Sequence, residues 1–164
     1  MKFGVFDHVD RGDLPLGQHY ENRLRLTEVY DREGFYAYHI AEHHSTPLGI
    51  AGAPSVFLSA VAQRTKRLRL GTLVYTLPLV NPLRLLEEVC MLDQMSGGRL
   101  ELGVGRGISP IEVGFSNLDT AIAQTMLMPF SAAHGTAAGA DSPYQTGGVG
   151  FCTHSSSTGT FLKR

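Results

Sequence analysis

Short apolar runs alternate with segments of helical spacing along the first 126 residues of the chain. The apolar runs predict four strands, at residues 3–6, 36–41, 68–75 and 100–104. Apolar positions three and four residues apart predict four helices, at residues 18–33, 54–65 and 82–96 and from residue 109 onward. Such alternation is typical of βα units built on a parallel sheet.

Residues that begin and end helices occur where this pattern requires them. Asn81 and Pro82 form a good N-cap and first position for the third helix, and Gly97 is placed to end it. Ser109 and Glu112 have the spacing of a capping box, which predicts the start of the fourth helix.

Four consecutive βα units leave two fold classes open. They are half of a (β/α)₈ TIM-type barrel or a small doubly wound sheet, and the hydrophobic pattern does not choose between them. A complete barrel typically needs about 250 residues, so the 164 residues of this chain suffice for only half of one.

The composition changes abruptly after Met126. Of the 38 residues from 127 to 164, 21 are Gly, Ala, Ser or Thr, and no helical or strand periodicity is evident. Such a segment buries too little apolar surface to offset the entropy of ordering it. The sequence therefore predicts a half barrel at residues 1–126 and a poorly ordered tail at 127–164. A truncation or a change of reading frame would explain the shift.

Charge and cysteine content exclude several function classes. The net charge is −1, and the basic stretch at residues 64–69 is interpreted as a solvated turn between a helix and a strand, so nothing indicates binding to nucleic acid or to an anionic membrane. No apolar run reaches the length of about 20 residues that a membrane span needs. Two cysteines, with Cys90 expected in the core, indicate no disulfide framework. These features predict a soluble, cytoplasmic protein.

Candidate chemistry lies where the predicted strands end, since parallel α/β folds bind ligands at the C-terminal ends of their strands. Glu42, His43 and His44 end the second strand. Successive strand residues point to opposite faces, so the two histidines are expected to have different roles. Either could be a structural histidine. A metal site with Asp7 or His8 is an alternative, although no ligand spacing typical of metal sites is present.

A second candidate site follows the fourth strand. Gly103, Gly105 and Gly107 surround Arg106 just before the predicted fourth helix. Glycines allow backbone N–H groups to approach an anion, and arginine adds a planar cation with several donors. A tight βα turn explains the glycines equally well, but it does not explain the arginine.

Residues 1–126 resemble the luciferase-like flavin monooxygenases, the family of bacterial luciferase. The resemblance rests on short motifs that occur in order on consecutive βα units. They are Met1-Lys2-Phe3-Gly4, Ala41-Glu42-His43-His44, Leu77-Pro78 followed by Asn81-Pro82, Leu92-Asp93-Gln94-Met95-Ser96-Gly97-Gly98-Arg99 and Gly103-Val104-Gly105-Arg106-Gly107.

The resemblance implies a barrel that binds reduced FMN, or deazaflavin F420 in some branches, at its C-terminal face. It implies that His43 is the catalytic histidine and that Arg106, between Gly105 and Gly107, binds the flavin phosphate. Leu73 and Val74 match the place where the family carries a non-prolyl cis peptide bond against the flavin ring.

The same resemblance implies a monooxygenase that receives reduced flavin from a separate reductase and oxidises a small organic substrate with O₂. Because only half of a family member is matched, the chain is expected to form homo- or hetero-oligomers and to be inactive alone. The alternatives are a non-catalytic barrel fragment that serves as an interaction module and, more distantly, a metal-dependent barrel hydrolase.

Overall fold

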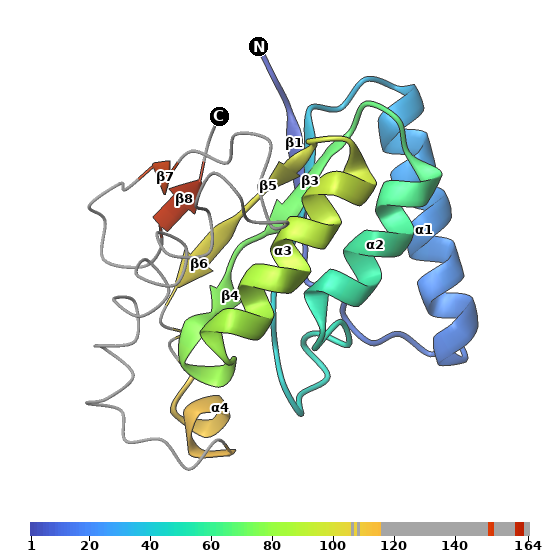
Figure 1. Ribbon diagram of the computed structural model, residues 1–164. Coiled ribbons are helices and arrows are strands. Elements are labelled where there is room, and N and C mark those ends of the chain that lie inside the picture. Colours follow the sequence, from blue (N-terminus) through green and yellow to red (C-terminus); the bar gives the residue numbers. More distant parts are fainter. Residues whose placement is uncertain (106, 108, 116–150, 153–159, 163–164) are drawn as a thin grey trace.

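The computed structural model describes residues 1–105, 107, 109–115, 151–152 and 160–162. Its first sheet holds four parallel strands in the order β1-β2-β3-β5 (Figure 1). These strands are β1 (Gly4–Asp7), β2 (Ala37–Ile40), β3 (Arg69–Thr72) and β5 (Leu100–Glu101). The helices that connect them are α1 (Leu16–Arg32), α2 (Pro54–Arg64) and α3 (Pro82–Ser96).

The strand order decides between the two predicted folds. Each strand of the first sheet pairs with the strand of the next βα unit. The three helices lie side by side on one face of the sheet (Figure 1). A doubly wound sheet reverses its strand order at a switch point and carries helices on both faces. The described units are therefore consecutive units of a (β/α)₈ barrel.

Two of the predicted strands are each divided into two shorter ones. The strand expected at 68–75 ends at Thr72 and resumes as β4 (Tyr75–Thr76), and the peptide bond between Leu73 and Val74 is cis, as the resemblance implied. The strand expected at 100–104 resumes as β6 (Gly103–Gly105), which pairs in parallel with β4. A short 3₁₀ helix, η1 (Leu77–Leu79), follows β4, and α4 (Pro110–Phe115) follows β6.

Two short strands occur in the segment for which the sequence showed no strand pattern. They are β7 (Phe151–Cys152) and β8 (Thr160–Leu162), which pair with each other in antiparallel orientation. β8 also pairs with β6, so the second sheet has the order β4-β6-β8-β7. The other residues of the predicted tail lie outside the described part of the chain.

The core lies between the sheet and the three helices. Cys90 is buried there, as expected, and burial raises the pKa of its thiol. The ends of α3 are also as predicted, because the side chain of Asn81 accepts N–H bonds from Leu83 and Arg84 and Gly97 has a φ of 68°. Among the helices that the structure describes, none is both long and apolar enough to cross a membrane.

Arg99 is hydrogen-bonded to α2, to α3 and to the segment before β3. Its guanidinium donates hydrogen bonds to the carbonyl oxygens of Ala62 and Thr65 at the end of α2, and to that of Leu68 just before β3. It also donates to the carbonyl of Ser96 in α3 and to the hydroxyl of Thr65. Burial lowers the pKa of Arg99. One cation thus satisfies helix-terminal carbonyls that would otherwise lack donors.

The basic stretch at residues 64–69 pairs with neighbouring acidic groups. Arg64 donates two bonds, at 3.0 and 2.8 Å, to the carboxylate of Glu21 on α1. The carboxylate of Asp31 accepts the backbone N–H groups of residues 66, 67 and 68. This agrees with the interpretation of the stretch as a connecting turn.

A polar cluster covers the sheet face opposite the helices. The carboxylate of Glu101 lies 2.6 Å from Nε of Arg69, 3.2 Å from Nε2 of His39 and 3.1 Å from the hydroxyl of Tyr36. Burial alone would raise the pKa of Glu101, but the hydrogen bonds from His39 and Arg69 outweigh burial and lower this pKa to about 2.

Acid is expected to remove the stability that Glu101 provides. Because its folded pKa lies below the unfolded value of 4.5, this stability is present above about pH 4.5 and is lost as the pH falls toward 2. The full shift corresponds to roughly 3 kcal/mol. Urea unfolding at pH 6 and pH 3 should show a smaller acid loss for Glu101→Gln than for wild type. Equal losses would contradict the assignment.

Candidate functional site

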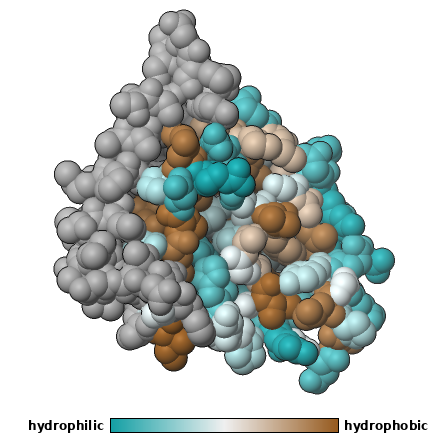
Figure 2. All heavy atoms as spheres, turned by 60° about the horizontal axis from the view of Figure 1, so that its bottom comes forward, coloured by the Kyte–Doolittle hydropathy of each residue, from teal (hydrophilic) through white to brown (hydrophobic). Residues whose placement is uncertain are grey.

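A cleft of about 250 Å³ lies where β1, β2 and β4 end, and it contains most of the predicted site residues. Figure 2 looks toward the end of the molecule to which the parallel strands run, where apolar and hydrophilic side chains are interleaved. The cleft brings His43, Leu73, Val74 and Gly107 together. Its lining residues are Phe6, His8, Ala41, Glu42, His43, Leu73, Val74, Thr76, Gly107 and Glu112.

The remaining predicted site residues are Gly105 and Arg106. Gly105 is buried in β6, where it pairs with Thr76 of β4. Arg106 lies outside the described residues. Asp7, considered with His8 for a metal site, points toward the helices and binds Arg23 and the hydroxyl of Tyr38. No group of three or more His, Cys, Asp or Glu side chains among the described residues is arranged to hold a metal ion.

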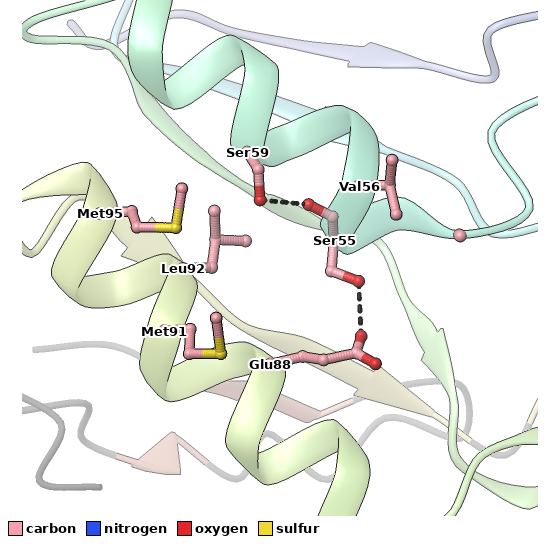
Figure 3. Close-up of a pocket in the computed structure, with 8 residues that line it drawn as sticks. Ser55, Val56, Ser59, Glu88, Met91, Leu92 and Met95 are labelled. Atoms are coloured by element: carbon pink, nitrogen blue, oxygen red, sulfur yellow. Dashed lines mark hydrogen bonds between the residues drawn. The ribbon is translucent and has the colours of Figure 1, made fainter. Parts of the chain in front are cut away.

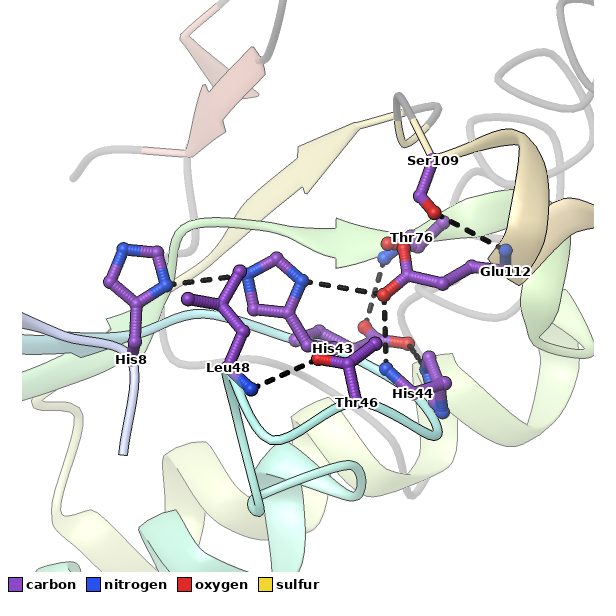
Figure 4. A network of polar contacts seen from close by, with 9 residues as sticks. His8, His43, His44, Thr46, Leu48, Thr76, Ser109 and Glu112 are labelled. Carbon is purple, nitrogen blue, oxygen red and sulfur yellow. Dashed lines mark hydrogen bonds and ion pairs between the residues drawn. The ribbon is translucent and has the colours of Figure 1, made fainter. Parts of the chain in front are cut away.

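The ring of His43 is held from both sides. Its Nδ1 lies 3.3 Å from Oε1 of Glu112, and its Nε2 lies 3.3 Å from Nδ1 of His8 (Figure 4). The His8 and His43 rings are nearly parallel, with centroids 5.4 Å apart and an interplanar angle of 10°. A buried carboxylate on one nitrogen is the arrangement that orients an imidazole for acid–base chemistry.

Glu112 has a different role from the one that its sequence position suggested. Its backbone N–H donates to the hydroxyl of Ser109, which is the first half of the predicted capping box. Its carboxylate does not complete the box. It is buried and accepts the bond from His43 and a 3.0 Å bond from the backbone N–H of His44. The Glu112 carboxylate binds His43 and the backbone of His44 in place of the local cap, because the His43 imidazole needs a hydrogen-bond acceptor.

His44 has a separate partner, as the alternation along the chain predicted. Its Nε2 lies 2.7 Å from Oε1 of the buried Glu42. The other oxygen of Glu42 accepts the backbone N–H of Thr76 at 2.9 Å. Burial raises the pKa of Glu42, although the bonds from His44 and Thr76 oppose this shift. The His44–Glu42 pair therefore fixes the end of β2 against β4.

Two glycines determine the shape of the cleft. Gly107 has a φ of 73°, and a Cβ at this position would lie 2.6 Å from Cγ2 of Thr76. A Cβ on the buried Gly49 would lie 3.1 Å from Cβ of His43 and 3.0 Å from the carbonyl oxygen of His8. Glycine thus lets the loops approach the strand ends closely.

Sequence reasoning missed three contributors to this site. They are His8 and Glu112, which are hydrogen-bond partners of His43, and Gly49, which packs against it. The position of His8 at the end of the first strand was a usable signal. Nothing near Gly49 or Glu112 in the sequence indicates contact with a histidine 6 or 69 residues away.

Comparisons with known proteins identify relatives of this chain. Residues 1–126 match the luciferase-like monooxygenase family. An uncharacterised protein of Sinorhizobium fredii is 56% identical over 119 residues, which are 73% of this chain and 35% of that protein. The oxygenase component of flavin-dependent trigonelline monooxygenase from Acinetobacter baylyi is 34% identical over 114 residues, which are 68% of this chain and 32% of that protein. The chain thus spans about a third of the length of these relatives.

A solved structure shows the same fold. The oxygenating constituent of 3,6-diketocamphane monooxygenase from Pseudomonas putida, in complex with FMN, superposes with a TM-score of 0.77 at 20% identity. The match covers 98% of this chain and 43% of that one. With the family match over residues 1–126 and four consecutive barrel units, this chain belongs to the luciferase-like monooxygenases.

Proposed function

We propose that this chain provides the flavin site and the acid–base histidine of a flavin-dependent monooxygenase that oxidises a small organic substrate with O₂. The observation that carries the proposal is the ring of His43, fixed between Glu112 and His8 in a cleft whose other wall is apolar. His43 would act as the general acid and base. When bound, reduced flavin would supply the electrons that activate O₂.

The residues of the cleft suit a flat, phosphate-bearing cofactor. Leu73 and Val74 offer an apolar wall against which a planar ring can pack. Gly107, which tolerates no Cβ beside Thr76, keeps the backbone open to an anion. We assign the phosphate to the segment of Gly105, Arg106 and Gly107. Reduced FMN is our first choice because the camphane relative was solved with FMN, and F420 is the alternative.

Flavin titration tests this proposal directly. Reduced FMN is expected to bind the chain, and Arg106→Ala is expected to weaken binding by about 1.5–3 kcal/mol, the scale of a charge-assisted hydrogen bond. Arg25→Ala is a matched control, since Arg25 on α1 is 70% exposed and pairs only with Glu21 among the described residues. Its titration curve should equal that of wild type.

Other outcomes of the titration would redirect the proposal. Equal curves for Arg106→Ala and wild type would remove Arg106 from the site. Tighter binding of F420 than of FMN would favour the alternative cofactor. Stoichiometric zinc without flavin affinity would favour the metal-dependent hydrolase.

We also propose partners for this function. A separate reductase would supply reduced flavin, which is supported by the trigonelline relative being named an oxygenase component. A reducing cytoplasm suits a chain whose Cys90 is buried as a small apolar residue. Neither nucleic acid nor a membrane is part of the proposal.

A hollow of about 300 Å³ between α2 and α3 is our candidate for contact with a second subunit (Figure 3). The apolar side chains on its two sides, Val56, Met91 and Met95, are 72%, 60% and 46% exposed. Within it, the hydroxyl of Ser55 donates to Glu88 at 2.6 Å, so the acidic group there is already paired. Apolar surface gathered in a groove is typical of a protein interface.

Met91→Glu is expected to shift the chain toward smaller species in size-exclusion chromatography with light scattering, because it places a charge inside the apolar hollow. Leu83→Glu is the matched control. Leu83 is 54% exposed on the same helix but does not line the hollow, so its variant should elute like wild type. Unchanged elution of Met91→Glu would exclude this surface.

The 164-residue chain alone is proposed to lack useful monooxygenase activity. The described units wall the cleft from one side, and Phe6 within it is 49% exposed. Water that enters the site promotes side reactions that compete with oxidation of the substrate. The alternative, a non-catalytic interaction module, is favoured by the exposed apolar hollow between α2 and α3. Substrate-dependent O₂ consumption by a monodisperse monomer would contradict both statements.

A further inference from the structure

We propose that His8 is a proton-relay residue for His43, in a chain of three groups that runs from Glu112 through His43 to His8. The inference rests on the proposed acid–base function of His43, and it assigns a partner to that function. Figure 4 shows the three side chains in one line, contributed by α4, the end of β2 and the end of β1.

The partners determine which nitrogen of each ring carries a hydrogen. A carboxylate only accepts, so Nδ1 of His43 must donate to Glu112. Neutral His43 then has a lone pair on Nε2, and Nδ1 of His8 must donate to it. Both rings are therefore held as the Nδ1–H tautomer. Nε2 of His8 remains as the acceptor at the outer end of the chain.

The backbone is built to hold His8 in this position. Val9, directly after His8, is fully buried with a φ of 52°, a conformation that β-branched residues rarely adopt. Its N–H donates to Asp7 at 2.8 Å, and its carbonyl accepts from Ile50 at 3.1 Å. A Cβ at Gly49 would lie 3.0 Å from the carbonyl oxygen of His8 and 3.2 Å from Cδ2 of His43, so the loop after β2 packs against the backbone of His8 and the ring of His43. Strain of this kind next to a polar cluster is typical of functional sites.

This arrangement moves a proton without a water molecule between the rings. A proton that binds Nε2 of His8 releases the Nδ1 proton of His8 to Nε2 of His43. His43 is then an imidazolium whose Nδ1–H still faces the Glu112 carboxylate. The new proton of His43 lies on Nε2 and faces Nδ1 of His8, so the reverse sequence returns it through His8 to the cleft that both rings line. In the forward direction an N–H bond forms on Nε2 of His8, the N–H bond on Nδ1 of His8 breaks and an N–H bond forms on Nε2 of His43. The reverse direction undoes each of these changes.

Nitrogen NMR of the ¹⁵N-histidine-labelled chain without flavin tests the geometry. We expect the Nδ1–H tautomer for both His8 and His43, and a coupling across the hydrogen bond between Nδ1 of His8 and Nε2 of His43. His39 is the internal control, because its Nε2 faces Glu101 and it should show the Nε2–H tautomer. The Nε2–H tautomer at His8, with His39 as expected, would overturn the proposal.

Turnover measurements test the relay itself. They use a completed barrel, in which residues 1–126 precede the remaining units of a relative. The amide of His8→Asn can still donate to His43 but cannot pass a proton, whereas His8→Leu does neither. Both variants are expected to lose at least tenfold in turnover at saturating flavin, and the flavin dissociation constant of each is measured alongside because His8 lines the cleft. Added imidazole should partly restore turnover to His8→Ala.

The outcomes separate the relay from the proposed function. If His43→Ala abolishes turnover but His8→Asn and His8→Leu retain it, the relay is wrong and the function of His43 stands. If His43→Ala also retains turnover, the proposed acid–base role fails first. Normal turnover in His8→Asn with loss in His8→Leu would reduce His8 to a residue that only positions the ring. Each result is read per mole of flavin-binding protein, so a folding defect does not mimic it.

Discussion

Arg99→Met is expected to lower the free energy of unfolding by about 1–3 kcal/mol, the cost of leaving carbonyl groups without their hydrogen-bond donors. The guanidinium of Arg99 serves the carbonyls of Ala62, Thr65, Leu68 and Ser96 at once. Methionine fills a similar volume but donates no hydrogen bond, so these oxygens lose their donors in a partly buried site. Urea unfolding of the two proteins measures the difference.

Two further variants show whether geometry or charge is responsible. Arg99→Lys keeps the charge but has no planar fork, so we expect it to recover only part of the loss. Arg25→Ala removes an exposed arginine that pairs with Glu21 four residues away, and should change the free energy of unfolding much less than Arg99→Met. A loss below about 1 kcal/mol for Arg99→Met would mean that water replaces the guanidinium and that Arg99 does not fasten the elements.

His43→Ala is expected to lower turnover of a completed barrel by about 10²–10⁴, the usual contribution of general acid–base catalysis. The ring contacts both Glu112 and His8 in the cleft and has a quarter of its side chain exposed. Turnover is compared at saturating flavin, because His43 lines the cleft that is assigned to the flavin ring. Stopped-flow measurement of product formation from reduced flavin and O₂ provides the rate.

His44→Ala should act mainly on stability. Its Nε2 is the partner of the buried Glu42, and Glu42 in turn holds the backbone N–H of Thr76. Removal of the imidazole leaves this carboxylate with one donor fewer, so the midpoint of unfolding should fall while turnover per folded molecule stays near wild type. Interchanged effects of the two substitutions would show that the wrong histidine has been assigned to the chemistry.

Hydrophobic periodicity predicted the alternation of strands and helices, and most limits agree within a few residues. It could not decide between a half barrel and a doubly wound sheet, because strand order is a property of the sheet and not of any local segment. It also could not show that the predicted third strand is divided at Leu73, since the apolar run continues through the break.

The candidate site was only half visible in the sequence. His43 and the glycines around Arg106 belong to short motifs, so they could be named in advance. Glu112 fitted a local capping pattern, so nothing in the sequence gave a reason to expect its contact with a histidine 69 residues earlier. Arg99 ended a recognised motif, but its role depends on carbonyls of α2 and of the segment before β3, which no neighbouring residue reveals.

The pairing of β8 with β6 sets up a competition for one edge of the sheet. β4 takes one side of β6, and β8 takes the other in antiparallel orientation, with Val104 opposite Thr160 and Gly103 opposite Phe161. A strand has only two hydrogen-bonding edges, and a fifth barrel strand must use the one that β8 fills, in parallel orientation. Closure of the barrel on this side therefore requires β8 to separate from β6. While β8 is paired there, no fifth parallel strand can pair with β6.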